Sequence, residues 1–232
     1  MQNDKIQNAI EKLKKAYACV IYDGNDREGE ADLIIHAKYI TPEWIERLRK
    51  NAGGLICLAI EPEIAKKMGL VFYTDILASS NFELKQMECK KTAYNDKPSF
   101  SIPVNHKEVY TGITDTDRAL TIKKLAELAE RAYKNEQTGT IQTGKGNLKG
   151  ESIKQEFMRS FYSPGHVFLL IGRGIENRKG HTELALELAR RAGMQGTMVL
   201  CEMLAPGRAL SKKKAKMYAE KYGYPFLEGS DF

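Results

Sequence analysis

Apolar residues recur at every third or fourth position in several stretches of the chain, which is the spacing of an amphipathic helix. In residues 4–17 they form one stripe with lysines on the opposite side, and in residues 117–133 a longer stripe repeats this spacing. Capping residues set further boundaries, since Thr41 and Pro42 begin a helix and Gly53 ends it. The predicted helices span residues 4–17, 42–52, 62–68, 117–133, 181–191 and 212–222.

Short apolar runs rich in β-branched residues separate these helices and predict buried strands. The predicted strands span residues 18–22, 33–36, 55–60, 100–104, 166–172, 197–204 and 224–227. Helices and strands alternate irregularly, with no fixed repeat and no linker that divides the chain. The pattern therefore predicts an α/β fold of the α+β type, in which residues 1–232 form a single domain with a mixed β-sheet and flanking helices.

Two stretches break this pattern. Between residues 74 and 99, Asn, Lys and Ser interrupt every apolar run, so no firm secondary structure is predicted there. Residues 135–150 are polar and rich in glycine, with too little apolar area to pack against a core. They predict an exposed loop, which has the character of an insertion.

Charge and cysteine content narrow the class of protein. The net charge is +6, which would suit an anionic ligand, but many of the lysines lie on predicted helices, where a solvated polar face explains them. The four cysteines show no paired spacing, which is typical of a protein from a reducing compartment. No apolar run approaches the ~20 residues that a membrane helix needs. We therefore expect a cytoplasmic protein without a membrane partner.

The most unusual stretch of this basic chain is an acidic one. Residues 23–32 contain five carboxylates, one arginine and two glycines, between two predicted strands. Such a segment repels itself unless water or a cation neutralises it, and the glycines allow the backbone to bend so that carboxylates converge. It predicts a cation site in a loop at a strand end.

Two of the four histidines follow glycine, and a predicted strand separates them. His166 is expected to begin that strand and His181 to begin the next helix, so both rings could face one site. The alternative is that each ring satisfies a local hydrogen bond. Arg178, Lys179 and Thr182 surround the start of the same helix, where backbone N–H groups favour an anion such as phosphate, although a solvated basic helix end explains them equally well.

Three further sites carry candidate chemistry. Glu202 interrupts an apolar run, so its carboxylate should be paired, bound to a metal or raised in pKa. Thr111 begins a loop of hydroxyls and carboxylates for which helix capping is the alternative. Cys57 is a candidate nucleophile, but a buried thiol is more often part of the core. Together with the acidic segment and the basic helix start, these groups fit magnesium-assisted enolisation of a phosphorylated ketose or sugar.

Six motifs in a fixed order make the chain similar to the 3,4-dihydroxy-2-butanone 4-phosphate synthase family. They cover most of the chain apart from the polar loop, and they are Asp-Arg-Glu-Gly-Glu-Ala-Asp at 26–32, Gly-Gly-Leu-Ile-Cys at 53–57, Thr-Gly-Ile-Thr-Asp at 111–115, Ser-Pro-Gly-His-Val at 163–167, Gly-His-Thr-Glu at 180–183 and Cys-Glu-Met at 201–203. The resemblance implies that ribulose 5-phosphate is converted into 3,4-dihydroxy-2-butanone 4-phosphate and formate, a step of riboflavin biosynthesis. It also implies a homodimer with active sites at the subunit interface.

The resemblance further implies roles for individual residues. Glu28 and His181 match the ligands of magnesium or manganese, with two ions per active site, and His166 and Glu202 match residues needed for proton transfer. Asp23, Glu30 and Cys57 match catalytic positions whose individual roles stay open. The positions that match substrate contacts are Arg27, Glu28, Asp32, Thr111, Arg178, Gly180 and Thr182. A lyase with a single catalytic domain is expected, because no second cysteine-rich segment indicates the GTP cyclohydrolase that is fused to some relatives.

Two other functions remain open at this point. A basic nucleic-acid-binding module would suit the net charge, but five clustered carboxylates would repel a phosphate backbone, so we expect no nucleic-acid partner. A metal-dependent sugar-phosphate isomerase or hydrolase would use the same groups as the synthase.

Overall fold

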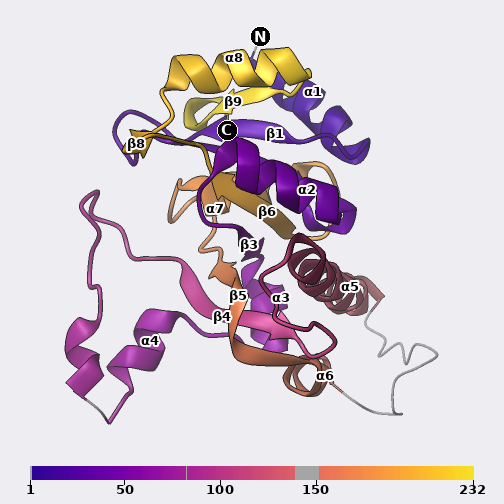
Figure 1. Cartoon of the computed structure of the whole chain (residues 1–232), viewed down its shortest axis with the longest axis vertical. Helices are drawn as coiled ribbons and strands as arrows, with labels where there is room; N and C mark the ends of the chain where they lie inside the picture. The colour runs from indigo at the N-terminus through magenta and orange to yellow at the C-terminus, as the bar shows by residue number, and fades with distance from the viewer. Residues whose placement is uncertain (1, 82, 139–151) are drawn as a thin grey trace.

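The structure is a computed structural model that describes residues 2–81, 83–138 and 152–232 (Figure 1). Seven strands form one sheet in the order β4-β5-β3-β6-β2-β1-β9. The pairs β1 with β9 and β3 with β5 are parallel, and the other neighbours are antiparallel. The strands are β1 (Cys19–Tyr22), β2 (Ala31–His36), β3 (Cys57–Ile60), β4 (Phe100–His106), β5 (Phe161–Ile171), β6 (Thr197–Glu202) and β9 (Phe226–Glu228). The predicted mixed sheet is therefore confirmed.

Helices cover both faces of this sheet (Figure 1). One buried cluster joins the sheet to α1 and α7, and the other joins it to α2, α3, α5, α6 and α8. The helices are α1 (Gln2–Lys14), α2 (Pro42–Arg47), α3 (Pro62–Met68), α4 (Tyr73–Ala78), α5 (Asp115–Thr138), α6 (Ile153–Ser160), α7 (His181–Arg191) and α8 (Lys212–Tyr222). No helix in the described ranges is long and apolar enough to cross a membrane.

The two faces follow from the alternation of side chains along each strand. Leu33 and Ile35 of β2 pack in the cluster of α2 and α5, whereas Ile34 packs in that of α1 and α7. Cys57 of β3 lies on the same side as Ile34. A polar residue two positions before Ile34, namely Asp32, must therefore also face the side of α7, which decides where the site forms.

Most predicted boundaries lie within a few residues of the observed ones. The Thr41 hydroxyl accepts a hydrogen bond from the Trp44 N–H at 3.3 Å, as expected of an N-cap. The predicted helix over 42–52 is α2 followed by a π-helical turn, Leu48–Ala52, which ends at Gly53 with φ of 91°. The small antiparallel pair β7 (Leu204–Ala205) and β8 (Arg208–Ala209) follows β6.

Three predictions were wrong or incomplete. β5 begins at Phe161, so His166 lies within the strand instead of starting it. Short elements were missed, including α4 and α6, because one or two helical turns give too little periodicity to recognise. Helix α5 extends to Thr138, into the predicted loop over 135–150, and the remainder of that loop lies outside the described residues.

Candidate functional site

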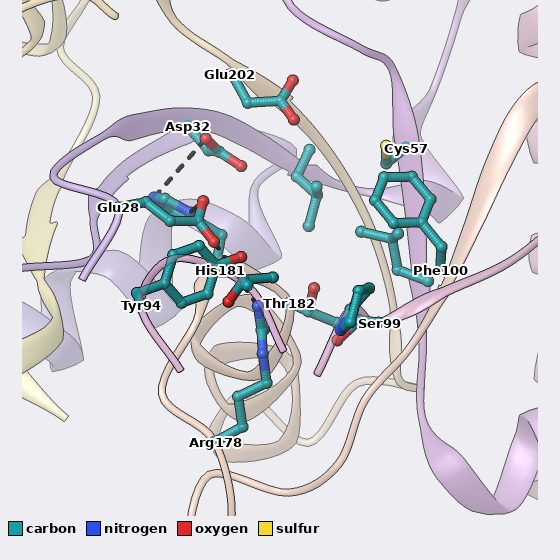
Figure 2. A pocket seen from close by; sticks show the side chains of 14 residues that line it. Glu28, Asp32, Cys57, Tyr94, Ser99, Phe100, Arg178, His181, Thr182 and Glu202 are labelled. Carbon is teal, nitrogen blue, oxygen red and sulfur yellow. Dashed lines mark ion pairs between the residues drawn. The ribbon is translucent and has the colours of Figure 1, made fainter. Parts of the chain in front are cut away.

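A cavity of about 280 Å³ lies on the α7 side of the sheet, beside the first turn of α7 (Figure 2). Asp32 of β2 is directly opposite Glu202 of β6 in the sheet, and both side chains line the cavity. Cys57, Leu170 and Leu200 provide an apolar wall, and Glu28, Arg178, His181 and Thr182 provide the polar one. Strands β2, β3, β5 and β6, the loops that carry Glu28 and Arg178, and the start of α7 therefore converge on a single cavity.

Asp23 organises the acidic loop from its centre. One of its carboxylate oxygens accepts hydrogen bonds from the backbone N–H groups of Gly24 and Glu30, and the other accepts one from Glu28, at distances of 2.9–3.1 Å. Gly29 allows the turn because its φ of +69° is unfavourable for other residues. The buried carboxylate thus holds the loop in a shape that presents Glu28 to the cavity.

His181 begins α7 and meets the acidic loop. Its Nε2 lies 3.1 Å from the Glu30 carbonyl oxygen and 3.7 Å from an Asp32 carboxylate oxygen, and its Nδ1 lies 3.7 Å from Glu28. Figure 2 marks the pair of His181 with Asp32. The ring therefore connects two carboxylates that come from different elements.

These contacts and the burial of the side chains shift the pKa values of all three groups. Burial opposes the charge on His181, but Asp32 and Glu28 outweigh it and raise the pKa of His181 to about 9. Burial also opposes the charge on Glu28, but hydrogen bonds from His181 and Tyr94 lower the pKa of Glu28 to about 2. Burial raises the pKa of Asp32 to about 7 despite the nearby His181. Asp32 can accordingly gain or lose a proton near neutral pH.

Asp23, Glu28 and His181 could hold a metal ion, because each offers one ligand atom and these atoms lie within 4.8 Å of one another. Carboxylate oxygens are ligands that suit both Mg²⁺ and Mn²⁺, and two of the three residues supply them. Next to this cluster, one buried oxygen of Asp32 has no hydrogen-bond partner among the described residues. The donor set fits the expected divalent ion.

The basic side of the cavity is built around Arg178. Its guanidinium forms an ion pair with the buried Glu183 of α7 at 2.5 Å, and it lies 3.7 Å from Glu28. A Cβ atom on Gly180 would collide with this guanidinium, so glycine is needed for Arg178 to fold across the helix N-terminus. The side chains of Arg178 and Thr182 both line the cavity (Figure 2).

Glu202 and Cys57 occupy the opposite end of the cavity (Figure 2). Glu202 accepts a hydrogen bond from the Leu55 N–H at 2.7 Å, which satisfies one of its carboxylate oxygens. A side chain on Gly54 would collide with Glu202, which explains the glycine there. Burial raises the pKa of Cys57 well above its usual value, and the thiol is therefore protonated, which argues against a thiolate nucleophile.

Sequence reasoning missed one contribution to the site. The segment that carries Tyr94 and Asp96 lies over the acidic loop, with Tyr94 hydrogen bonded to Glu28 and Asp96 paired with Arg27 at 2.8 Å. The Tyr94 ring lies 5.4 Å from the Arg27 guanidinium. Nothing in the periodicity of this polar segment indicates such contacts, although a tyrosine between polar residues is a weak signal of a binding loop.

His166 and Thr111 do not line the cavity. Both are exposed and lie near Asn105, which contacts the His166 ring at 3.2 Å and accepts a hydrogen bond from the His166 N–H at 2.8 Å. The weaker contact from Asn105 to the Thr111 carbonyl is 3.4 Å long. The expectation that the rings of His166 and His181 face one site is therefore not met within a single chain.

Residues 7–232 match the family model described as 3,4-dihydroxy-2-butanone 4-phosphate synthase. Among proteins of that name, the one from Methanosarcina acetivorans is 41% identical over 238 residues, covering 99% of this chain and 90% of the relative. The one from Archaeoglobus fulgidus is 38% identical over 231 residues, with 96% and 90% covered.

Solved structures agree with this match. A 3,4-dihydroxy-2-butanone 4-phosphate synthase in complex with two magnesium ions is 25% identical, with a TM-score of 0.70 over 97% of this chain and 93% of that one. The enzyme of that name from Candida albicans is also 25% identical, with a TM-score of 0.69 over 97% and 94%. The fold of this chain is therefore the fold of these proteins.

The raised pKa of His181 predicts an imidazolium at neutral pH. In NMR titrations of the metal-free protein, His181 should titrate near pH 9, and Asp32→Asn should lower its pKa by about one to three units because a compensating charge is lost. Since the pKa of His181 is raised on folding, its contribution to stability is present below pH 6.5 and is lost as pH rises through about 9.

His36 provides the internal reference for this titration, because burial lowers its pKa and its ring contacts the Gln195 carbonyl. The spectrum of His181→Gln assigns the His181 signal. A His181 ring that titrates at or below pH 6.5 in the wild type would contradict the ion-paired site.

Proposed function

The chain belongs to the 3,4-dihydroxy-2-butanone 4-phosphate synthase family, and from this premise we propose that it converts D-ribulose 5-phosphate into L-3,4-dihydroxy-2-butanone 4-phosphate and formate. The reaction is a lyase step of riboflavin biosynthesis. The observation that supports it best is one cavity with a carboxylate and histidine cluster beside a buried arginine. The first feature suits metal-assisted enolisation, and the second suits a phosphate group.

We propose Mg²⁺ or Mn²⁺ as the cofactor, with two ions per active site. Glu28 and His181 would hold the metal, and Asp23 contributes by shaping the loop or as a further ligand. A bound divalent ion polarises a carbonyl and the neighbouring hydroxyl, which makes the proton between them easier to remove. The relative that contains two magnesium ions supports this choice.

Carboxylates around the cavity would share the proposed proton transfers with His166. Asp32 is suited to exchange a proton near neutral pH because burial raises its pKa to about 7. Glu202 lies opposite Asp32 on the neighbouring strand β6, held by the Leu55 N–H, and would act on the same end of a bound sugar. Burial likewise raises the pKa of Glu30. Cys57 would contact the carbon skeleton as a neutral thiol.

The phosphate group would bind at the first turn of α7. Arg178 is aimed there by Glu183, and the Thr182 hydroxyl and the backbone after Gly180 supply further donors. Arg27 reaches the same region from the acidic loop. These groups neutralise a phosphate monoester and fix its orientation, so that the ketone end points towards Asp32 and Glu202.

We propose that the active enzyme is a cytoplasmic homodimer whose site is completed by its partner. His166 and Thr111 match catalytic and substrate-binding positions, yet they lie outside the cavity of their own chain. Beside them is an apolar groove with Val71, Met158 and Tyr162, which are 51%, 58% and 40% exposed. A subunit interface over this groove would bury it and bring His166 to the cavity of the other subunit.

The proposed reaction predicts metal-dependent formate. Purified protein incubated with ribulose 5-phosphate should release formate, detected by proton NMR, with Mg²⁺ and not with EDTA. Glu28→Gln should lower the rate at least about 100-fold because a charged metal ligand is lost. Glu46→Gln, which removes a half-exposed carboxylate of α2 that is paired with Lys50, is the matched control and should retain the rate. No formate above the EDTA level would contradict the proposed function.

A shared site predicts complementation between inactive variants. His166→Asn and Glu202→Gln should each be inactive alone. After mixing and exchange of subunits, about half of the dimers are mixed, and each has one intact site, so about a quarter of the wild-type rate should return. Failure of the mixture to regain activity, when exchange is confirmed by native mass spectrometry, would rule out a site shared in this way.

A further inference from the structure

Asp96 occupies the space between the two arginines of the site. One of its carboxylate oxygens lies 2.8 Å from Arg27 Nη2 and 3.5 Å from Arg178 Nε. Arg178 is 8% exposed and already paired with Glu183, so Asp96 is a further carboxylate beside a cation that has little access to water. An anion supplied by the protein thus stands where two cations converge.

The Asp96 carboxylate neutralises charge beside Arg27 and Arg178, but it forms no well-oriented hydrogen bond with either guanidinium. Arg27 Nε and Nη2, Arg178 Nε and the Asp96 oxygen are all buried without a hydrogen-bond partner among the described residues. Guanidinium groups donate in a fixed plane, and one oxygen placed between two of them meets neither plane well. An anion with three terminal oxygens around one centre would serve more of these donors.

The position of Asp96 is set by the backbone around it. The Thr92 N–H donates to the Asp96 carbonyl at 2.7 Å, and the Asp96 N–H donates to the Thr92 hydroxyl at 3.2 Å, with Asn95 in the left-handed region at φ of 65°. Just beyond the turn, the Pro98 carbonyl accepts a hydrogen bond from Arg173 at 3.1 Å. The carboxylate is therefore held towards the arginines by a closed turn and an anchored neighbour.

We propose that Asp96 is a specificity-determining residue that competes with the phosphate group of the substrate for Arg27 and Arg178. This inference rests on the proposed function, because it concerns the same substrate. A doubly charged phosphate displaces the singly charged carboxylate, since it offers more charge and more oxygens to the two arginines. A sugar without phosphate has no group to replace Asp96, so the turn stays closed over the site.

Such competition lowers the apparent affinity for phosphate, because phosphate binds only to those molecules in which Asp96 does not occupy the space between the arginines. The same turn carries Tyr94, which is hydrogen bonded to Glu28. If the turn moves when Asp96 is displaced, this hydrogen bond breaks and the Glu28 carboxylate becomes available to a ligand in the cavity. Binding of the phosphate and exposure of the metal-ligand side of the loop are thereby coupled.

The test is calorimetric titration of inorganic phosphate at about pH 8 in EDTA, which requires no turnover. Asp96→Asn should bind phosphate about tenfold more tightly than the wild type, because the competing charge is gone and the shape is kept. Asp26→Asn is the matched control, since Asp26 is an exposed carboxylate in the loop of Arg27, and its affinity should stay within about twofold.

Equal binding by the wild type and Asp96→Asn would overturn the proposal, as would a gain of the same size in Asp26→Asn. Weaker binding by Asp96→Asn would also overturn it and would mean that Asp96 positions the arginines for the substrate. Asp96→Ser, with a shorter neutral side chain, should reproduce the gain if Asp96→Asn does not fold. Formate release reports separately on the proposed function, so the two can fail independently.

Discussion

The site depends on the compensation of clustered negative charge by His181 and Arg178 at the start of α7. Asp23, Glu28 and Asp32 lie close enough to repel one another in an interior that screens charge poorly. The raised pKa of His181 and the lowered pKa of Glu28 are two expressions of the same attraction. Without the helix start beside it, repulsion between these carboxylates would oppose the loop shape that the hydrogen bonds to Asp23 maintain.

The sheet brings the acidic loop and the start of α7 together. The loop joins β1 to β2, and α7 packs on the face to which Asp32 points, so the alternation of β2 decides that Asp32 meets His181. The same register sets Glu202 opposite Asp32. Glycines at positions 54 and 180 remove the side chains that would otherwise collide with Glu202 and Arg178. A register shift of one residue would turn these carboxylates away from the cavity.

Sequence patterns predicted those parts of the site that follow from local chemistry. The acidic segment, the helix that begins at His181 and the strand that carries Glu202 are all recognisable from charge, capping and apolar runs. Tyr94 and Asp96 were missed because their role comes from a long-range contact of an irregular segment, which leaves no periodic signal. The motif that contains His166 could be recognised in the sequence, but the position of His166 in the fold could not. β5 begins at Phe161, before the apolar run that predicted the strand, so His166 lies within the strand and outside the cavity.

The proposed function requires a divalent metal between the acidic loop and α7. The most direct measurement is anomalous X-ray scattering from crystals grown with Mn²⁺. It should give a peak within bonding distance of both Glu28 and His181, about 2.0–2.3 Å from each, and no such peak in Glu28→Gln crystals. A manganese peak that is bonded to neither Glu28 nor His181 would contradict the proposed metal site.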